Sequence, residues 1–221
     1  MWDETMTVML LEGIRDTVYM TLVSTFFGYV IGLPLGIALT LTDKGGIAPN
    51  RTIYHILDIV INITRSVPFL ILLIMVMPLT KVIVGKTYGS TATIVPLTLA
   101  AAPLIGRMVE SSLNEVSQGV IEAAVSMGAK TKTIVFKVLI GEARTSLFVG
   151  MTIVLGTVLG YSAMAGVIGG GGLGDIAIRY GYYRYDTPVM LVTLVFIVAI
   201  VQLMQGAGTF AAKKLDHRNK D

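Results

Sequence analysis

Four long stretches of the chain contain no Asp, Glu, Lys or Arg, and each is long enough to cross a bilayer, since a transmembrane helix needs roughly 20 apolar residues. They are residues 17–42, 87–106, 145–174 and 187–212. A fifth stretch, 66–80, is shorter, but Ile59–Thr64 extend it across Arg65. We predict a helix there over 58–79, kinked near Pro68, which has no backbone N–H to donate. Five transmembrane helices are therefore expected: 17–42, 58–79, 87–106, 145–168 and 187–212.

The composition agrees with a lipid environment. Hydrophobic residues make up 54% of the 221 residues and charged residues 14%, with a mean hydropathy of +0.77. Soluble domains carry about 25% charged residues. The predicted fold is all-α and polytopic, with residues 1–221 forming one transmembrane domain.

The distribution of Lys and Arg predicts the orientation, because cytoplasmic segments carry an excess of both. The segments 43–52, 107–144 and the tail after 212 hold eleven, and the opposite side holds five. We therefore expect the N-terminus outside, the C-terminus in the cytoplasm and 107–144 as the largest cytoplasmic loop. The mixed-charge tail after 212 is expected to anchor the last helix at anionic headgroups.

The loop 107–144 is too long for a simple helix connection, which usually takes two to eight residues. Apolar residues recur in it at helical spacing, and Gly128 interrupts them, so the pattern predicts two short amphipathic helices. The recurring residues are Ile121, Val125, Met127, Ile134, Val135, Val138 and Leu139. Pattern alone leaves two alternatives open: helices lying on the membrane surface, or a docking element for a soluble partner.

The segment Ile121–Ala129 resembles the EAA loop of ABC-importer permeases. Its Glu-Ala-Ala triplet and Gly128 stand at the offset that this family uses. Where the family has Leu-Pro further on, this chain has Ile140-Gly141, and we expect the glycine to break the helix there.

The resemblance implies that the loop forms coupling helices that insert into a cytoplasmic ATPase. In that role Ala123 and Ala124 allow close approach, Gly128 permits a turn, and Glu122 pairs with a basic group or caps a helix.

Several further segments resemble the methionine-type ABC permease, and the resemblance covers nearly the whole chain. The segment that favours methionine is Gly160–Gly166, which reads Gly-Tyr-Ser-Ala-Met-Ala-Gly; other such segments are Arg65–Phe69, Ile94–Leu97, Gly170–Gly174 and Tyr180–Tyr182. The implied function is ATP-driven import of methionine, L- and possibly D-, by alternating access. The alternative is a permease for another small solute, such as glycine betaine or a polar amino acid.

The same resemblance implies the partners and the location. It predicts a homodimer in the bacterial inner membrane with two cytoplasmic ATPase subunits and an extracytoplasmic binding protein. ATP and Mg would be held by the ATPase, and no Walker A pattern occurs here. We therefore expect no enzyme activity, catalytic residue, metal site, cofactor or nucleic-acid partner in this chain. A transporter acting alone would favour charges at mid-membrane, and only Arg65 is a candidate for that position.

Four residues are candidates for a translocation path or gate. Arg65 would act as a gate or pair with Asp58; the alternative is a position near the cytoplasmic surface, where it snorkels. Tyr161, Ser162 and Met164 stand near the outward end of the fourth span, where soft contacts to a thioether are favourable. Helix packing explains these three equally well.

Two glycine patterns have structural explanations. Gly169-x-Gly171-x-x-Gly174 matches the dinucleotide fingerprint, but that fingerprint requires a strand before it, so we interpret it as a flexible outer turn or a gate. Gly28, Gly32 and Gly36 form a ladder in the first span, as do Gly156 and Gly160 in the fourth. Such ladders favour close helix packing, within the subunit or across a dimer.

Overall fold

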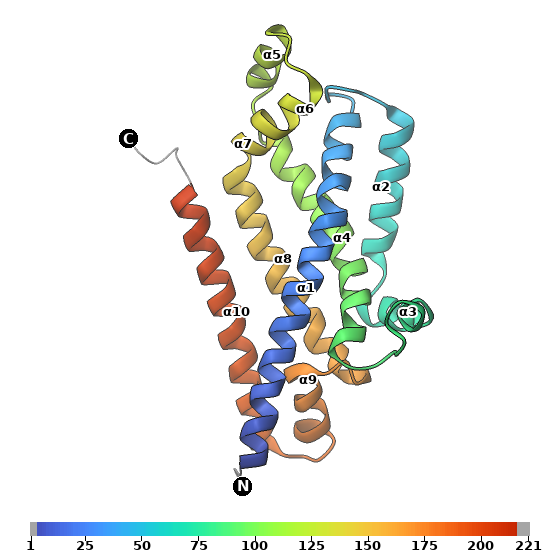
Figure 1. Ribbon diagram of the computed structural model, residues 1–221, viewed down its shortest axis with the longest axis vertical. Helices are drawn as coiled ribbons and strands as arrows, with labels where there is room; N and C mark the ends of the chain where they lie inside the picture. Colours follow the sequence, from blue (N-terminus) through green and yellow to red (C-terminus); the bar gives the residue numbers. More distant parts are fainter. Residues whose placement is uncertain (1–3, 216–221) are drawn as a thin grey trace.

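A computed structural model describes residues 4–215 and is helical throughout its regular structure (Figure 1). The all-α prediction is confirmed. In chain order the elements are α1 Glu4–Thr42, α2 Arg51–Ser66, α3 Phe69–Val84, α4 Ser90–Asn114, α5 Gln118–Ser126, α6 Thr131–Thr133, the π-helix η1 Ile134–Leu139, α7 Ile140–Glu142, α8 Arg144–Ala165, the 3₁₀ turn η2 Gly166–Ile168, α9 Gly172–Ile176, the π-helix η3 Ala177–Tyr182 and α10 Thr187–Leu215.

Within residues 4–215, four helical segments are long and apolar enough to cross a membrane, and a fifth span results if α2 and α3 are counted together. The predicted kink near Pro68 is a complete break, because α2 and α3 meet at 107°. Val67 is extended (φ −77°, ψ 124°), as expected for a residue before proline. The helix also begins earlier than expected, at Arg51, where the side chain of Asn50 accepts the N–H of Ile53 at 3.1 Å.

The glycine ladder of α1 packs within the protomer, so that alternative is confirmed. A Cβ on Gly32 would lie 2.5 Å from the Ala102 carbonyl oxygen, and one on Gly36 would lie 2.6 Å from that of Gly106. Only glycine allows α1 to approach α4 this closely. In the second ladder, Gly156 faces Gln205 of α10, whereas Gly160 has open space beside it.

The larger of two hydrophobic cores runs along α4, and the smaller one joins the start of α1 to α9 and α10 around Leu10 and Leu173. The larger core joins Met20 of α1, Leu97 and Ile105 of α4 and Val154 of α8, and it continues through Leu139 to Ala124. The segment α5–α7 is thereby fixed at one end of the molecule. Figure 1 shows that α10 ends toward this side, whereas α1 begins at the opposite end. Which end faces the cytoplasm stays a prediction, and residues 216–221 of the tail lie outside the described part.

Candidate functional site

The helix α5 carries the Glu-Ala-Ala triplet at the tip of the molecule (Figure 1). Ala124 is buried against the core, while Glu122 and Ala123 are exposed. Two apolar neighbours are also exposed, Val125 at 51% and Met127 at 80%. The predicted pair of short helices is confirmed, since α5 is followed by the segment α6–α7. A helix presenting small and apolar side chains outward offers a docking face to another protein.

Gly128 ends α5 in a left-handed conformation with φ +74°. The Ala129 N–H donates to the Ala124 carbonyl at 3.1 Å, and the Gly128 N–H donates to the Val125 carbonyl at 2.9 Å. These two bonds define a Schellman motif with glycine at its left-handed position. A Cβ on Gly128 would meet no atom within 4 Å. The glycine is therefore required by the backbone angle and not by lack of space.

The second half of the loop differs from expectation at Gly141. The helix α7 runs through this glycine, and the helical backbone is interrupted two residues later, at Ala143 (φ −81°, ψ 0°). The expected break at Gly141 is therefore wrong. The start of the predicted loop also changes, because α4 continues to Asn114 and includes Arg107.

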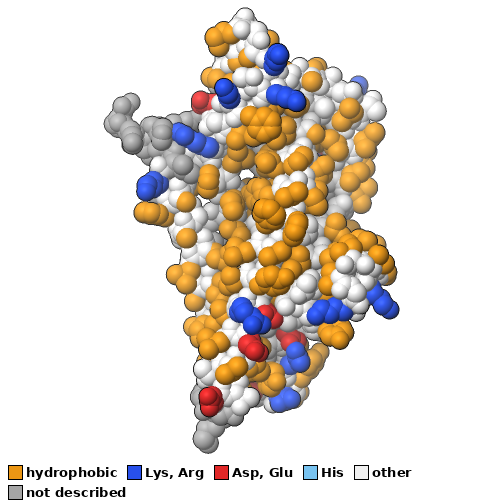
Figure 2. All heavy atoms as spheres, in the orientation of Figure 1, with side chains coloured by type: hydrophobic (Ala, Val, Ile, Leu, Met, Phe, Trp, Pro, Cys, Tyr) orange, Lys and Arg blue, Asp and Glu red, His pale blue; other side chains and the backbone are white. Residues whose placement is uncertain are grey.

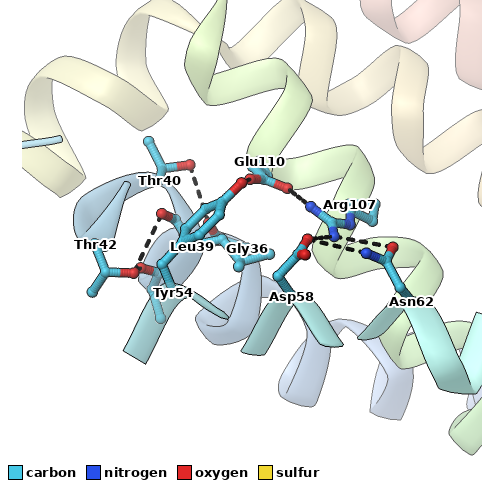
Figure 3. A network of polar contacts seen from close by, with 10 residues as sticks. Gly36, Leu39, Thr40, Thr42, Tyr54, Asp58, Asn62, Arg107 and Glu110 are labelled. Atoms are coloured by element: carbon cyan, nitrogen blue, oxygen red, sulfur yellow. Dashed lines mark hydrogen bonds and ion pairs between the residues drawn. The ribbon is translucent and has the colours of Figure 1, made fainter. Parts of the chain in front are cut away.

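A polar network joins α2 to α4 (Figure 3). Arg107 forms an ion pair with Asp58, and it binds Glu110 at 2.7 Å and the amide oxygen of Asn62 at 3.0 Å. The Tyr54 hydroxyl donates to Glu110 at 3.4 Å. Glu110 is 7% exposed, so its charge depends on Arg107 for compensation. The proposed partner of Arg65 is thus wrong, since Asp58 pairs with Arg107.

The network belongs to a polar face that follows α2 along its whole length. Helical spacing places five polar side chains on this face, which we call the α2 polar stripe: Arg51, His55, Asp58, Asn62 and Arg65. Other positions of α2, such as Ile56, Ile59 and Ile63, are apolar and exposed. Charged groups are costly against lipid. The stripe therefore marks the side of α2 that avoids lipid.

Sequence reasoning missed Arg107, Glu110 and the stripe. The signal was present, because Arg107 and Glu110 stand three residues apart and Asp58, Asn62 and Arg65 recur at helical spacing. The predicted span begins at Asp58 and the predicted loop begins at Arg107. Helix boundaries drawn from charge-free windows exclude such residues from the helices that carry them.

Arg65 lies in the last turn of α2 and is exposed. It is about 21 Å along the helix from Arg51, at 1.5 Å per residue. Arg65 is therefore remote from the segment 43–52, which is predicted to be cytoplasmic, and its role as a gate or as a snorkelling residue stays a prediction. Four residues later, the Phe69 ring stacks on Tyr161, with centroids 4.7 Å apart. The first residue after the break between α2 and α3 thus contacts α8 at Tyr161.

The other candidates on α8 point in different directions. Ser162 is 1% exposed and its hydroxyl donates to the Leu159 carbonyl at 2.7 Å. Met164 is 49% exposed. In this conformation Ser162 packs inside the protomer, whereas Met164 is available on its surface.

The glycine turn after α8 is packed and not an exposed flexible segment. The Gly89 N–H donates to the Gly169 carbonyl, the Thr93 hydroxyl donates to that of Gly170, and the Leu173 N–H donates to the Thr17 hydroxyl at 2.8 Å. Leu173, Gly174 and Asp175 are buried. The expected flexible turn is thus wrong. Helix precedes the turn, so the dinucleotide fingerprint is a coincidence. No group of three or more His, Cys, Asp or Glu suited to a metal ion occurs in the part of the chain described.

Comparison with known proteins places this geometry in a family. The model of the binding-protein-dependent transport system inner membrane component family matches residues 16–218. The chain belongs to this family. It is therefore the membrane component of such a transport system, an ABC-type permease, and the resemblance to methionine-type permeases is confirmed.

Several similar proteins have names that refer to methionine transport. The chain is 47% identical to the probable D-methionine transport system permease protein MetI of Vibrio cholerae over 210 residues, covering 95% of this chain and 93% of the relative. It is 49% identical to the D-methionine permease MetI of Escherichia coli K12, covering 74% and 76%. A solved chain of the MetNI methionine ABC transporter, from a set of inward-facing conformations, superposes with a TM-score of 0.96 at 47% identity, covering 98% of this chain and all of that one.

Proposed function

We propose that this permease moves methionine, both L and D, into the cytoplasm by alternating access. The observation that carries the proposal is its similarity to the solved methionine-transporter chain, with a TM-score of 0.96 and 47% identity. Similarity over nearly the full length, at 47% to the Vibrio cholerae protein, supports the same cargo class. The conformation of the protomer matches a chain from an inward-facing transporter, which corresponds to one end of the cycle.

The working unit in this proposal contains two copies of the chain, two cytoplasmic ATPases and an extracytoplasmic binding protein. ATP and Mg are held by the ATPases. The N-terminus lies outside and the C-terminus inside the cell membrane. This orientation puts α5 on the cytoplasmic side, where a docking helix for an ATPase has to be.

Coupling to the ATPase runs through Glu122, Ala123, Ala124 and Gly128. The small exposed Ala123 lets the partner approach α5 closely, while buried Ala124 fixes α5 to the core. Glu122 is free to bind a basic group of the partner. Gly128 sets the angle between α5 and the segment α6–α7. A displacement of α5 by the ATPase is then transmitted to that segment through a rigid turn.

The α2 polar stripe lines the passage in this proposal. A second copy related by a two-fold axis would face its own stripe toward the first, and the polar groups would meet water and not lipid. Arg65, Tyr161 and Met164 stand at the end of this passage remote from α5, where the gate would be. Ser162 supports this part of α8 from its buried side.

Uptake in liposomes tests the function. The permease is reconstituted with its ATPase and binding protein, and ATP-dependent uptake of labelled L-methionine is measured with unlabelled D-methionine, glycine betaine and histidine as competitors. Competition by D-methionine alone supports the proposal. ATP hydrolysis that couples to glycine betaine or histidine, without methionine uptake, would leave a permease but remove methionine as its cargo.

A further inference from the structure

A short turn joins η3 to α10 at the end of the molecule opposite α5 (Figure 1). Figure 2 shows charged side chains around this end and hydrophobic side chains over the middle of the same face, so the turn lies beyond the apolar band. Three tyrosines on it have exposed side chains: Tyr182 at 61%, Tyr183 at 62% and Tyr185 at 89%. We call residues 179–186 the tyrosine turn. Large exposed aromatic side chains gathered on one short segment mark a contact site for another molecule.

The backbone of this turn holds Tyr185 in a strained conformation. Its φ is 57°, and no other residue besides glycine has a positive φ among residues 4–215. The Tyr185 N–H donates to the Tyr182 carbonyl at 3.3 Å, and the Thr187 N–H donates to the Tyr185 carbonyl at 3.1 Å. The Asp186 carboxylate accepts the Val189 N–H at 3.2 Å and caps α10. Strain that the surroundings hold in place is typical of functional sites. Because the Tyr185 ring is almost fully exposed, this strain does not serve packing within the protomer.

Two exposed arginines accompany the tyrosines. The Arg184 guanidinium lies over the Tyr180 ring, 4.6 Å from its centroid, and forms no ion pair within residues 4–215. The Arg179 side chain donates to Asp175 at 2.8 Å, and it is 63% exposed although Asp175 is buried. Stacking and pairing restrict both guanidinium groups in advance, so a partner loses little of its binding energy to ordering them. Since the carboxylates of Asp175 and Asp186 are engaged within the protomer, the turn presents cations outward and favours a partner with exposed carboxylates.

We propose that the tyrosine turn is the docking surface for the extracytoplasmic binding protein, which presents carboxylates to Arg179 and Arg184 and apolar hollows to the tyrosine rings. The family to which the chain belongs depends on a binding protein, and the turn lies at the end remote from α5. Tyrosine and arginine are also among the residues most enriched where protein interfaces concentrate their binding energy. The inference rests on the proposed function for the side of the membrane that this end faces, but it does not depend on the cargo.

Lipid headgroups and a second copy of the chain suit the turn less well. Tyrosines of an aromatic belt are placed by the bilayer interface, and a strained backbone adds nothing to that placement. A second copy related by a two-fold axis would bring the same turn against itself. Arg184 of each copy would then lie against like charge, which opposes association.

The test measures docking between the permease–ATPase complex in lipid nanodiscs and the binding protein that supports uptake in the liposome assay. Tyr185→Asn removes the ring and keeps the backbone, because asparagine tolerates the left-handed conformation. Its matched control is Tyr88→Asn, since Tyr88 is likewise exposed, at 68%, but lies between α3 and α4. Arg184→Gln removes a cation of the turn, and Lys86→Gln removes an exposed one elsewhere. Recovery of the ATPase complex and its melting temperature show that each variant is folded.

We expect Tyr185→Asn and Arg184→Gln each to weaken docking about tenfold or more, whereas both controls dock like the wild type. Added salt should weaken docking of the wild type more than that of Arg184→Gln. Equal affinities of Tyr185→Asn and Tyr88→Asn would overturn the proposal, as would unchanged docking of Arg184→Gln. Either result beside normal methionine uptake by the wild type would leave the proposed function standing. Conversely, loss of docking in both variants with a binding protein for another solute would remove methionine as the cargo and keep the docking surface.

A labelled variant separates the three possible occupants. The chain has no cysteine, so Tyr183→Cys can carry a single fluorophore on the turn. Its emission should change when the binding protein is added. Quenching by nitroxide-labelled headgroups, with no response to the binding protein, would show a lipid anchor and overturn the proposal. A disulfide between two unlabelled copies of this variant would show that a second copy covers the turn and would overturn it as well.

Discussion

Phe69 and Tyr161 stack face to face, with ring planes 4° apart and centroids 4.7 Å apart. Phe69 is the first residue of α3, directly after the break at Pro68, and Tyr161 belongs to the last turns of α8. Phe69 is buried at 7% exposure. This contact ties the break between α2 and α3 to the helix that carries two further gate candidates.

Replacing Tyr161 tests the stack. Tyr161→Ala removes the ring contact, worth about 0.5–1.5 kcal/mol beyond the buried area, and should lower both thermal stability and methionine uptake. Tyr161→Phe keeps the ring and should preserve stability. Uptake by Tyr161→Phe then separates the hydroxyl from the ring: a loss of uptake at unchanged stability would show that the hydroxyl itself acts on the cargo. Retained stability in Tyr161→Ala would contradict the structural role.

Replacing Gly128 should uncouple ATP hydrolysis from uptake. Gly128→Val forces a β-branched residue to φ +74°, where L-residues lose roughly 1–2 kcal/mol or more. The turn after α5 would shift while the complex stays assembled. ATPase rate and methionine uptake are measured on the same liposomes, and the ratio of uptake to hydrolysis should fall.

Two further variants make the Gly128 test specific. Gly141→Val is a matched control, because a Cβ there also has open space but the backbone is helical. Gly128→Asn should recover coupling in part, since asparagine tolerates the left-handed conformation. Equal loss in Gly128→Val and Gly141→Val would show that the backbone angle is not the cause.

Removing Arg107 should destabilise the protein more than removing its partner Asp58. Arg107→Gln leaves Glu110 buried with an uncompensated charge, at a cost on the order of 3 kcal/mol. Asp58→Asn leaves Arg107 paired with Glu110 and should cost less. Apparent melting temperatures in detergent measure both, and the double variant should resemble Arg107→Gln, because both act in one network. A larger fall in melting temperature for Asp58→Asn than for Arg107→Gln would show that compensating the charge of Glu110 is not the main contribution of Arg107 to stability.

Substitution of glycine by alanine should change stability differently in the two glycine ladders. Gly32→Ala puts a Cβ 2.5 Å from the Ala102 carbonyl oxygen, and overpacking of this kind costs about 1–3 kcal/mol. Gly160→Ala meets nothing within 4 Å and should leave stability unchanged. The yield of folded protein and its melting temperature report the difference. A tolerated Gly32→Ala would mean that α1 moves away from α4 at little cost.

Local patterns predicted four of the membrane helices and the short helices of the segment α5–α7 from sequence alone, whereas the expected helix 58–79 is divided at Pro68. Charge-free windows predicted the spans, because lipid excludes charges over a length that a sequence displays directly. Gly128 was identified as a turn residue because a left-handed backbone favours glycine whatever surrounds it. Each of these properties depends only on the residues of a single segment.

Only the tertiary structure decided which segments meet. Asp58 pairs with Arg107, 49 residues later in the chain, because α2 packs on α4 at this point. Arg65 stands further along the same helix as Asp58 and does not face it across a helix interface. Packing against Thr17 of α1 and the start of α4 fixed the turn at Gly169–Gly174 and buried Leu173 and Gly174, and Ser162 likewise lies inside the protomer. A residue pattern records the periodicity of its own helix, but the distance and rotation between two helices depend on side chains from both.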